Sequence, residues 1–317
     1  MNDHKQIVET VNLTRKFGGD VAVAGVNLRV ERGQIFGLIG SNGAGKTTTV
    51  RMLTTLLKPT SGTALVDGFD IVGQPERVRA GIGYVPQEAQ ADEALTGREH
   101  LILQGRLYGL AGASLTQRID KVLDLVGLRD VADKRALEYS GGMRKLLDVA
   151  SGLVHEPKLL FIDEPTSGVD ITHRQKLIDY VKWLPDAGTT VFLTSHYLEE
   201  VDQLADRVAI IDNGQVLVEG APAELKAGVG SSILDITLRQ SDGTSLQQVA
   251  GLLREIGGLT KVVTTGNRLK SFGSFDDELL PKVRSSLEQL DVTVAALTIA
   301  QPTLDDVFFY HIGREIN

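Results

Sequence analysis

A glycine-rich segment with one lysine and two threonines contains the residue types that could do chemistry. Residues 40–48 read Gly-Ser-Asn-Gly-Ala-Gly-Lys-Thr-Thr and directly follow the apolar run 35–39. This spacing fits the pattern G-x-x-x-x-G-K-[ST], in which backbone N–H groups converge on phosphate oxygens. Lys46 would add a positive charge at the β- and γ-phosphates, and the Thr47 hydroxyl could hold Mg²⁺. The sequence therefore predicts a nucleotide-binding loop that opens a helix. Its predicted contacts are Gly40, Ser41, Asn42, Gly43, Ala44, Gly45, Lys46, Thr47 and Thr48.

Two consecutive acids, Asp163 and Glu164, follow a second apolar run at residues 159–162. An apolar strand would deliver both carboxylates at its C-terminal edge, where ligands bind in open α/β sheets. Asp163 fits a Mg²⁺-associated carboxylate, and Glu164 could accept a proton from an attacking water. A solvated acidic pair at a strand end is the alternative, and the nucleotide loop makes that alternative the weaker one.

Ser140-Gly141-Gly142 is a third element that could bind phosphate. A serine can cap a helix, and two glycines leave backbone N–H groups open to an anion. One nucleotide needs only one such cradle, so this tripeptide would alone be read as a turn. Its place shortly before the strand that ends in Asp163 argues for a second phosphate site.

The elements that must position these residues alternate between strands and helices. Strand-like runs occupy residues 7–13, 21–30 and 34–39, a helix is expected over 47–57, and residues 63–66 favour another strand. Residues 88–155 have helical character, including a capping box at Thr96 and Glu99 and an apolar face at Ile119, Val122, Leu123 and Val126. Strand signals return at 159–162, 190–193, 208–211 and 216–218. Helices between them predict an α/β core with a partly parallel sheet.

The last part of the chain has a pattern of its own. Small residues at 227–232 predict a linker, which divides the chain into domains at 1–226 and 233–317. Beyond the linker the order is βαββαβ, with a turn at Gly266-Asn267, a helix that Asp276 could cap, and a final helix at 304–310. This order predicts a small α+β domain of the ferredoxin-like, split βαβ type.

Composition narrows the functional class. The chain has 317 residues, a formal net charge of −8 and no cysteine. Nucleic acid is disfavoured as the main partner, because a phosphate-binding face should carry a basic excess. No apolar stretch reaches the roughly 18 residues of a membrane span, and the N-terminus lacks the apolar core of a secretory signal. Residence in the cytosol is therefore expected.

With these motifs in this order, residues 5–225 resemble the ATP-binding cassette family, whose signature motif has a Ser-Gly-Gly core in this place. The other landmarks of that family follow. Gln87 matches the Q-loop glutamine, Asp170 the D-loop aspartate, and His196 the switch histidine, while Phe17 stands where an aromatic stacks on adenine. The plainer alternatives are a loop glutamine, a surface histidine and a core aromatic.

The resemblance implies a head-to-tail dimer with two ATP molecules between the copies. Each ATP would be held by residues 40–48 of one copy and by Ser140, Gly141 and Gly142 of the other. Phe17 and Asp170 would complete the nucleotide contacts. Glu164, His196, Gln87 and Lys46 would act in catalysis, and Thr47, Gln87 and Asp163 would bind Mg²⁺. The implied architecture is a P-loop NTPase cassette with a β-rich N-terminal part and a helical subdomain inserted at about 88–155.

Two further features are similar to the daunorubicin/doxorubicin-resistance export subfamily. The signature reads Tyr139-Ser-Gly-Gly-Met143 where Leu and Gln are commonest, and the tail at 301–308 reads Gln-Pro-Thr-Leu-Asp-Asp-Val-Phe. The implied function is the ATPase subunit of an exporter at the cytoplasmic face of the cell membrane. Its partners would be a separate permease of the ABC-2 type and a second copy of itself.

Two alternatives are weaker. A non-transport cassette ATPase acting in DNA repair or translation typically has two cassettes in one chain or a long coiled coil, and this chain has neither. A P-loop kinase or GTPase would leave Ser140-Gly141-Gly142 and His196 without a role.

Overall fold

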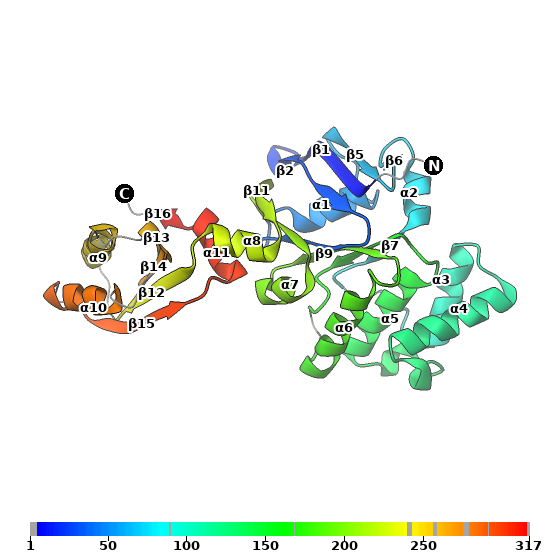
Figure 1. Cartoon of the computed structure of the whole chain (residues 1–317). Helices are drawn as coiled ribbons and strands as arrows, with labels where there is room; N and C mark the ends of the chain where they lie inside the picture. The colour runs from blue at the N-terminus through cyan, green and yellow to red at the C-terminus, as the bar shows by residue number, and fades with distance from the viewer. Residues whose placement is uncertain are drawn as a thin grey trace. The chain divides into compact units, whose positions relative to one another are not determined.

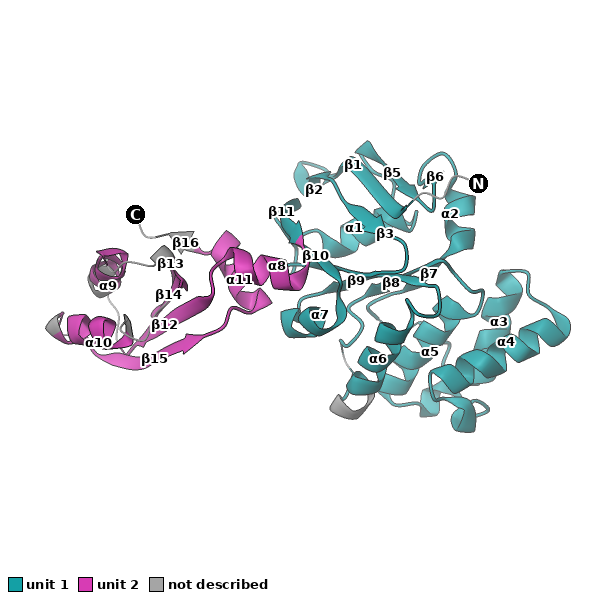
Figure 2. Ribbon diagram, in the orientation of Figure 1, with its two compact units in different colours: residues 1–219 teal, residues 220–317 magenta. Residues whose placement is uncertain are grey.

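The computed structural model of the chain divides it into two compact units, residues 1–219 and 220–317 (Figure 2). It describes residues 5–88, 90–167, 169–239, 243–255, 259–274, 279–290 and 292–315. Both units combine strands and helices, so the predicted mixed α/β class is confirmed.

An antiparallel sheet forms the β-rich N-terminal part of the first unit. It is built from β1 (Gln6–Phe17), β2 (Asp20–Val26), β3 (Arg29–Glu31), β5 (Ser61–Val66) and β6 (Phe69–Asp70). β1 pairs with β2, β3 and β5. Ile7, Val8 and Leu13 of β1 are buried and contribute to the core of this unit.

A second sheet has the strand order β11-β10-β4-β9-β8-β7. Its members are β4 (Ile35–Ile39), β7 (Ile82–Val85), β8 (Leu159–Asp163), β9 (Thr190–Ser195), β10 (Arg207–Asp212) and β11 (Gln215–Gly220). The strands from β10 to β7 all pair in parallel. Every residue of β4, β8 and β9 is buried, which explains their continuous apolar runs.

Helices cover the parallel sheet. α1 (Lys46–Leu53) lies between the two sheets (Figure 1), and its Val50, Met52 and Leu53 join a core made from both of them. The other helices of the sheet connections are α2 (Pro75–Gly81), α6 (Ile171–Trp183) and α7 (Leu198–Leu204). α1 begins immediately after the glycine-rich loop, as the sequence predicts.

A helical subdomain is inserted between β7 and β8, at the place predicted for residues 88–155. It contains α3 (Gly97–Leu107), α4 (Gly112–Leu125) and α5 (Gly141–Leu153), with short 3-10 turns at Arg129–Val131 and Ala136–Glu138. The predicted capping box is present, because the Thr96 side chain accepts a hydrogen bond from Glu99 N and the Glu99 side chain accepts one from Thr96 N. The predicted apolar face of α4 is buried at Ile119, Val122 and Leu123.

The second unit has its own sheet and core. Its elements are α8 (Pro222–Gly228), β12 (Ser232–Leu238), α9 (Gly243–Glu255), β13 (Leu259–Thr265), β14 (Arg268–Gly273), α10 (Leu279–Gln289), β15 (Val294–Ala300), α11 (Leu304–Ile312) and β16 (Arg314–Glu315). The strand order is β15-β12-β14-β13-β16, and the pairings are antiparallel. Val249, Leu253, Val283 and Leu287 of α9 and α10 pack with Leu234 and Ile236 of the sheet.

The division of the chain that the sequence predicts differs at α8 from the division in the structure. The sequence predicts a linker at 227–232, whereas the structure divides the chain at Gly220 and places α8 in the second unit. The physical reason is that α8 contacts α11. The helix cap predicted at Asp276 lies outside the described residues.

The glycine-rich loop is held by close approach of three backbone segments. Gly45 has φ +108°, and a Cβ placed on it would lie 2.6 Å from the carbonyl oxygen of Ala22 in β2. A Cβ on Gly40 would lie 2.2 Å from the carbonyl oxygen of Ile211 in β10. Gly214, in the turn after β10, donates its N–H to Ala44 O at 3.0 Å. The fold itself therefore requires glycine at positions 40 and 45.

Gly45→Ala should destabilise the first unit by about 2–4 kcal/mol, because it combines left-handed backbone strain with a clash. Gly43→Ala is the matched control, since Gly43 has φ +84° but open space around it. It should cost only about 1–2 kcal/mol. Urea unfolding of both variants measures the difference, and equal losses would contradict the clash at Gly45.

A chain that ends at Gly230 should fold and bind nucleotide with an affinity within about twofold of the full chain, because the two units have separate cores. Thermal unfolding and nucleotide titration measure this. A chain that ends at Asp206 is the control and should not fold, because it lacks β10, which pairs with β4. Loss of nucleotide binding in a folded chain ending at Gly230 would contradict the independence of the first unit.

Candidate nucleotide-binding site

The carboxyl ends of four neighbouring parallel strands, β4, β9, β8 and β7, meet at one edge of the sheet. The register pairs Ile39 with Ser195, Thr194 with Asp163, and Ile162 with Val85. The residues that follow these strand ends are the glycine-rich loop, His196, Glu164 and Gln87. Groups far apart in the sequence thus lie at one edge, where α/β sheets bind ligands.

Lys46 is buried on the inner side of the loop. Its Nζ donates hydrogen bonds to Gly40 O at 2.8 Å and Ser41 O at 3.1 Å. The same nitrogen lies 3.7 Å from Glu164 Oε1. Burial lowers the pKa of Lys46, and the nearby carboxylates of Glu164 and Asp163 oppose that shift. A cation is therefore positioned between the loop and the carboxylates.

Asp163 is held by two hydroxyl groups. Its side chain is 1% exposed, and its Oδ1 accepts hydrogen bonds from Thr47 Oγ1 at 3.3 Å and from Thr194 Oγ1. Oxygen atoms from α1, β8 and β9 thus meet at one point, and oxygen is the ligand type that Mg²⁺ requires. Sequence reasoning missed Thr194. The signal that could have found it is a hydroxyl in an otherwise apolar strand directly before Ser195-His196.

Glu164 has an unusual backbone for a non-glycine residue. Its φ is +56°, and its side chain is almost fully buried, with 4% exposure. The conformation is stabilised by hydrogen bonds from Glu164 N to Thr194 O at 3.1 Å and to Thr194 Oγ1 at 3.2 Å. Positive φ at a non-glycine residue often marks a functional site. The strained backbone turns the carboxylate toward Lys46.

His196 contacts the other oxygen of the same carboxylate. Its Nδ1 lies against Glu164 Oε2. The His196 ring also lies 3.9 Å from the ring of Tyr197, measured between centroids. The structure therefore brings Lys46, Thr47, Asp163, Glu164 and His196 into one contiguous cluster.

Ser140 caps helix α5 and marks a second helix N-terminus. Its hydroxyl accepts a hydrogen bond from Met143 N at 3.2 Å, and both Ser140 and Gly141 are exposed. Tyr139 is buried, and its hydroxyl donates to Val131 O at 2.8 Å. The tyrosine in the signature is thus explained by packing within the helical subdomain, and the capped helix end remains open to solvent.

Phe17, Gln87 and Asp170 are exposed, in contrast to the buried cluster. Phe17 is 47% exposed at the end of β1, and the Arg15 guanidinium lies 4.5 Å from its ring centroid. The alternative reading as a core aromatic is therefore wrong. Gln87 follows β7, and Asp170 directly precedes α6. β1 pairs with β2, whose Ala22 approaches Gly45, so the ring belongs to a hairpin beside the loop.

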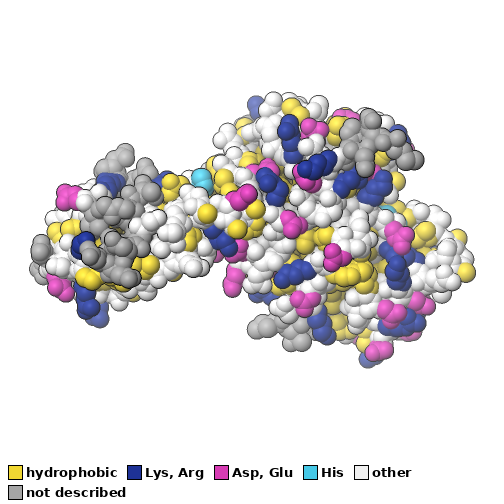
Figure 3. Space-filling model, in the orientation of Figure 1, with side chains coloured by type: hydrophobic (Ala, Val, Ile, Leu, Met, Phe, Trp, Pro, Cys, Tyr) yellow, Lys and Arg dark blue, Asp and Glu magenta, His cyan; other side chains and the backbone are white. Residues whose placement is uncertain are grey.

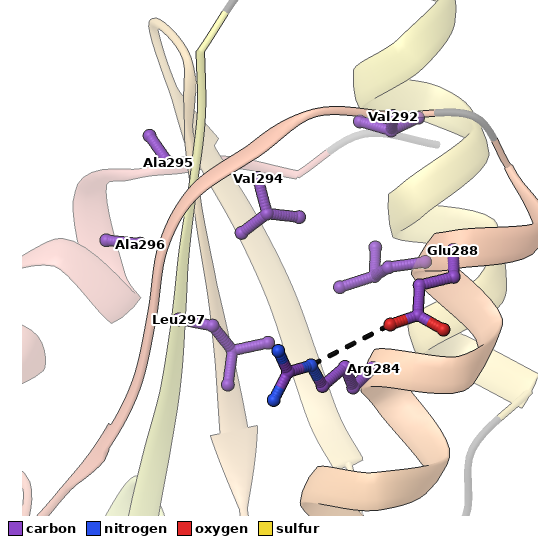
Figure 4. Close-up of a pocket in the computed structure, with 8 residues that line it drawn as sticks. Arg284, Glu288, Val292, Val294, Ala295, Ala296 and Leu297 are labelled. Atoms are coloured by element: carbon purple, nitrogen blue, oxygen red, sulfur yellow. Dashed lines mark ion pairs between the residues drawn. The ribbon is translucent and has the colours of Figure 1, made fainter.

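The structure has two notable hollows outside this cluster. One, of about 650 Å³, lies in the first unit and is lined by residues that include Tyr84, Gln90, His100 and Asp148. The other, of about 450 Å³, lies in the second unit between α10 and β15 (Figure 4). The charged residues that line this second hollow are Arg284 and Glu288, which pair at 3.8 Å. The other described residues that line it are apolar.

Charge is mixed over the visible surface. On the face shown in Figure 3, the Lys and Arg side chains of the first unit are interspersed with Asp and Glu. None of the helices in the described part of the chain has the length and apolar character that a bilayer crossing requires.

Comparison with known proteins identifies the family. A family model described as ABC transporter matches residues 23–167. The chain is 42% identical over 307 residues to the daunorubicin/doxorubicin resistance ATP-binding protein DrrA of Streptomyces peucetius, covering 97% of this chain and 92% of that protein. It is 34% identical over 313 residues to the doxorubicin resistance ATP-binding protein DrrA of Mycobacterium tuberculosis, covering 97% and 93%.

A solved structure agrees with this assignment. CbiO1 from Clostridium perfringens, part of an ABC transporter complex, superposes with a TM-score of 0.66 and 27% identity, and the match covers 71% of this chain and 92% of that one. Since relatives of more than 30% identity are matched over nearly their whole length, and since the site has the geometry described above, the chain belongs to the ATP-binding cassette family and is an ABC ATPase.

Proposed function

We propose that the protein is the ATP-hydrolysing subunit of an exporter and that it works as a head-to-tail dimer around two ATP molecules. The dimer is proposed because one chain has two helix N-termini that could each hold a phosphate. One is the loop that opens α1, and the other is the Ser140-capped end of α5. In the proposed dimer, one ATP would contact the α1 site of one copy and the α5 site of the other, which gives the second site a role.

The residues of the cluster suggest how hydrolysis proceeds. A water attacks the γ-phosphorus, Glu164 accepts its proton, and the bond to the β-phosphate oxygen breaks to leave ADP and phosphate. Lys46 stabilises the charge on the β- and γ-phosphates, and His196 orients the Glu164 carboxylate that it contacts. Phe17 would stack on adenine, and Ser41, Asn42 and Thr48 would line the phosphates.

Mg²⁺ fits the oxygen atoms at the end of β8. Thr47 Oγ1 and Asp163 Oδ1 lie 3.3 Å apart, and both are hard oxygen ligands. We infer that these two residues, with the Gln87 amide oxygen, hold the ion when it is bound with ATP. The ion would supply positive charge to the β- and γ-phosphates.

Two observations support export with a separate permease. Both DrrA relatives are named for resistance to doxorubicin, and the Streptomyces peucetius protein is named for daunorubicin as well. The described helices include none that could cross a membrane, so a partner of the ABC-2 permease type would supply the pathway. The protein would then act at the cytoplasmic face of the cell membrane. The substrate class inferred from the relatives is an antibiotic or a similar apolar compound, and lipid export is a related option.

The second unit is proposed to be an accessory domain of ferredoxin-like type. Its order βαββαβ from β12 to β15, with the sheet order β15-β12-β14-β13, supports this interpretation. The helix α11 and strand β16 follow as an extension. We propose a role in dimerisation or regulation, with simple stabilisation as the alternative.

Glu164→Gln should retain ATP binding, lower turnover by at least about 100-fold and trap an ATP-bound dimer, because an amide cannot accept the proton. Steady-state hydrolysis and light scattering with ATP measure the two effects. Glu138→Gln is the control, since Glu138 is an exposed residue of the helical subdomain. Turnover above about a tenth of the unaltered protein would contradict the role of Glu164.

The protein should be recovered with membranes when it is co-expressed with an integral membrane protein encoded next to it, and not when it is expressed alone. Inverted vesicles that contain both proteins should accumulate a fluorescent anthracycline with ATP, and Glu164→Gln should abolish the accumulation. ATP hydrolysis stimulated by ribosomes or DNA, without membrane recruitment, would instead favour a non-transport ATPase.

A further inference from the structure

Helix α5 carries two buried charged residues that the proposed mechanism leaves without a role. Lys145 is 3% exposed and Asp148 is 4% exposed. They are three residues apart and therefore lie on one face of the helix. Burying charged groups is costly unless each is paired, so their partners should indicate why they are there.

Both residues bind the backbone of the loop that follows β7. Lys145 Nζ donates to Pro86 O at 2.6 Å and to Gln87 O at 3.2 Å. Asp148 accepts from Gln90 N, at 3.2 Å to Oδ1 and 3.3 Å to Oδ2, and also from the backbone of Ala91. One helix face thus binds Pro86 and Gln87 at one end of this loop and Gln90 and Ala91 at the other.

The carboxylates at the end of β8 also act electrostatically on Lys145. Burial lowers the pKa of Lys145, while Asp148, Asp163 and Glu164 each act to raise it. Its charge therefore acts in the field of the two carboxylates at the end of β8. Asp148 also lines the 650 Å³ hollow of the first unit, together with Pro86 and Gln90. Both residues therefore contact the loop after β7, and Asp148 also lines the hollow.

The far end of α5 is fixed to the sheet. A Cβ on Gly83 in β7 would lie 2.1 Å from Gly152 O, so the helix and the strand meet there without side chains between them. The Arg118 side chain from α4 binds the last carbonyls of the same helix, with Nη2 at 2.6 Å from Leu153 O and Nε at 3.0 Å from Val154 O. The Ser140 end is exposed, and Lys145 lies between the two ends.

We propose that Lys145 and Asp148 are positioning residues of the ATPase reaction. They attach the loop at 86–91 to α5, so that a phosphate bound at Ser140–Gly142 determines where the Gln87 side chain lies. This inference rests on the proposed dimer, in which that phosphate belongs to an ATP held by the loop of the second copy. A tilt of α5 about its fixed end near Gly152 moves the loop with it. Hydrolysis in one site is thereby made to depend on occupation of the other.

Lys145→Met tests the attachment, because it removes both hydrogen bonds and keeps an unbranched side chain. It should lower kcat by about 10- to 100-fold, since small displacements of a positioned group have effects of that size. The dissociation constant for ATP should stay within about twofold, because the loop at 40–48 is unchanged. Lys145→Arg retains the charge and donors and should restore kcat to within about threefold of the unaltered protein.

Arg118→Met is the matched control. It also removes two hydrogen bonds from the end of α5, together with an ion pair to Glu156, but no contact with the loop after β7. The backbone contact between Gly83 and Gly152, about which α5 would tilt, is unchanged. It should lower the melting temperature at least as much as Lys145→Met does and leave kcat within about twofold. A merely structural role for Lys145 predicts equal kcat losses in the two variants, which would overturn the proposal. A kcat for Lys145→Met within about twofold of the unaltered protein would also overturn it.

Asp148→Asn provides a second measurement if Lys145→Met does not fold. Amide hydrogen exchange at Gln90 and Ala91 should accelerate about 10-fold while exchange within α5 is unchanged, and kcat should fall. Unchanged exchange or unchanged kcat would overturn the proposal. ATP-dependent dimerisation of Glu164→Gln is measured alongside. If that dimer does not form, the proposed function fails. If it forms and both Lys145→Met and Asp148→Asn hydrolyse ATP at the normal rate, only the present inference fails.

Discussion

The parallel register of β4, β9, β8 and β7 is the constraint on which the site depends. Because these strands are hydrogen-bonded neighbours, the residue after each strand end is placed to within about one residue spacing. A shift of one residue in β8 would exchange the faces of Asp163 and Glu164. The continuous apolar burial of β4, β8 and β9 therefore serves to fix polar groups that lie outside it.

Because the charged groups at that edge of the sheet are buried, the loss of any one of them would be costly. Lys46, Asp163 and Glu164 are all almost fully buried, and each is supported by partners on other elements. Removing one member of such a cluster leaves the others without compensation, which costs several kcal/mol in typical proteins. The strained backbone of Glu164 also depends on a neighbouring element, because its N–H is hydrogen-bonded to Thr194 of β9. The site is therefore preorganised for charge that ATP brings.

Much of this could be predicted from the sequence, because local signals were strong. The loop at 40–48, the acids after β8, the capping box at Thr96 and the helical insertion all depend on residues close together in the chain. What escaped prediction depends on contacts between distant segments. Examples are the insertion of β9 between β4 and β8, the hydrogen bonds of Thr194, and the hold of Lys145 on the loop after β7.

The boundary between the two units also escaped prediction because it depends on contacts between distant segments. Small residues at 227–232 favour a linker, but the contact of α8 with α11 decides which unit the helix joins. That contact joins residues more than seventy positions apart in sequence. Local composition carries no information about it. The exposed state of Phe17 was likewise open to two readings until its surroundings were known.

In the proposed dimer, the loss of one phosphate must change the stability of a closed state by several kcal/mol. Moving a two-state equilibrium from 1:99 to 99:1 requires about 5.5 kcal/mol. One helix N-terminus interacting with an anion contributes about 0.3–2 kcal/mol, which is insufficient alone. Two ATP molecules, each between an α1 and an α5 and each beside a Lys46, would add several such favourable interactions together. A coupling that moves Gln87 with α5 would then make the release of these interactions cooperative. Loss of the γ-phosphate from one site would alter the helix that positions Gln87 in the other site.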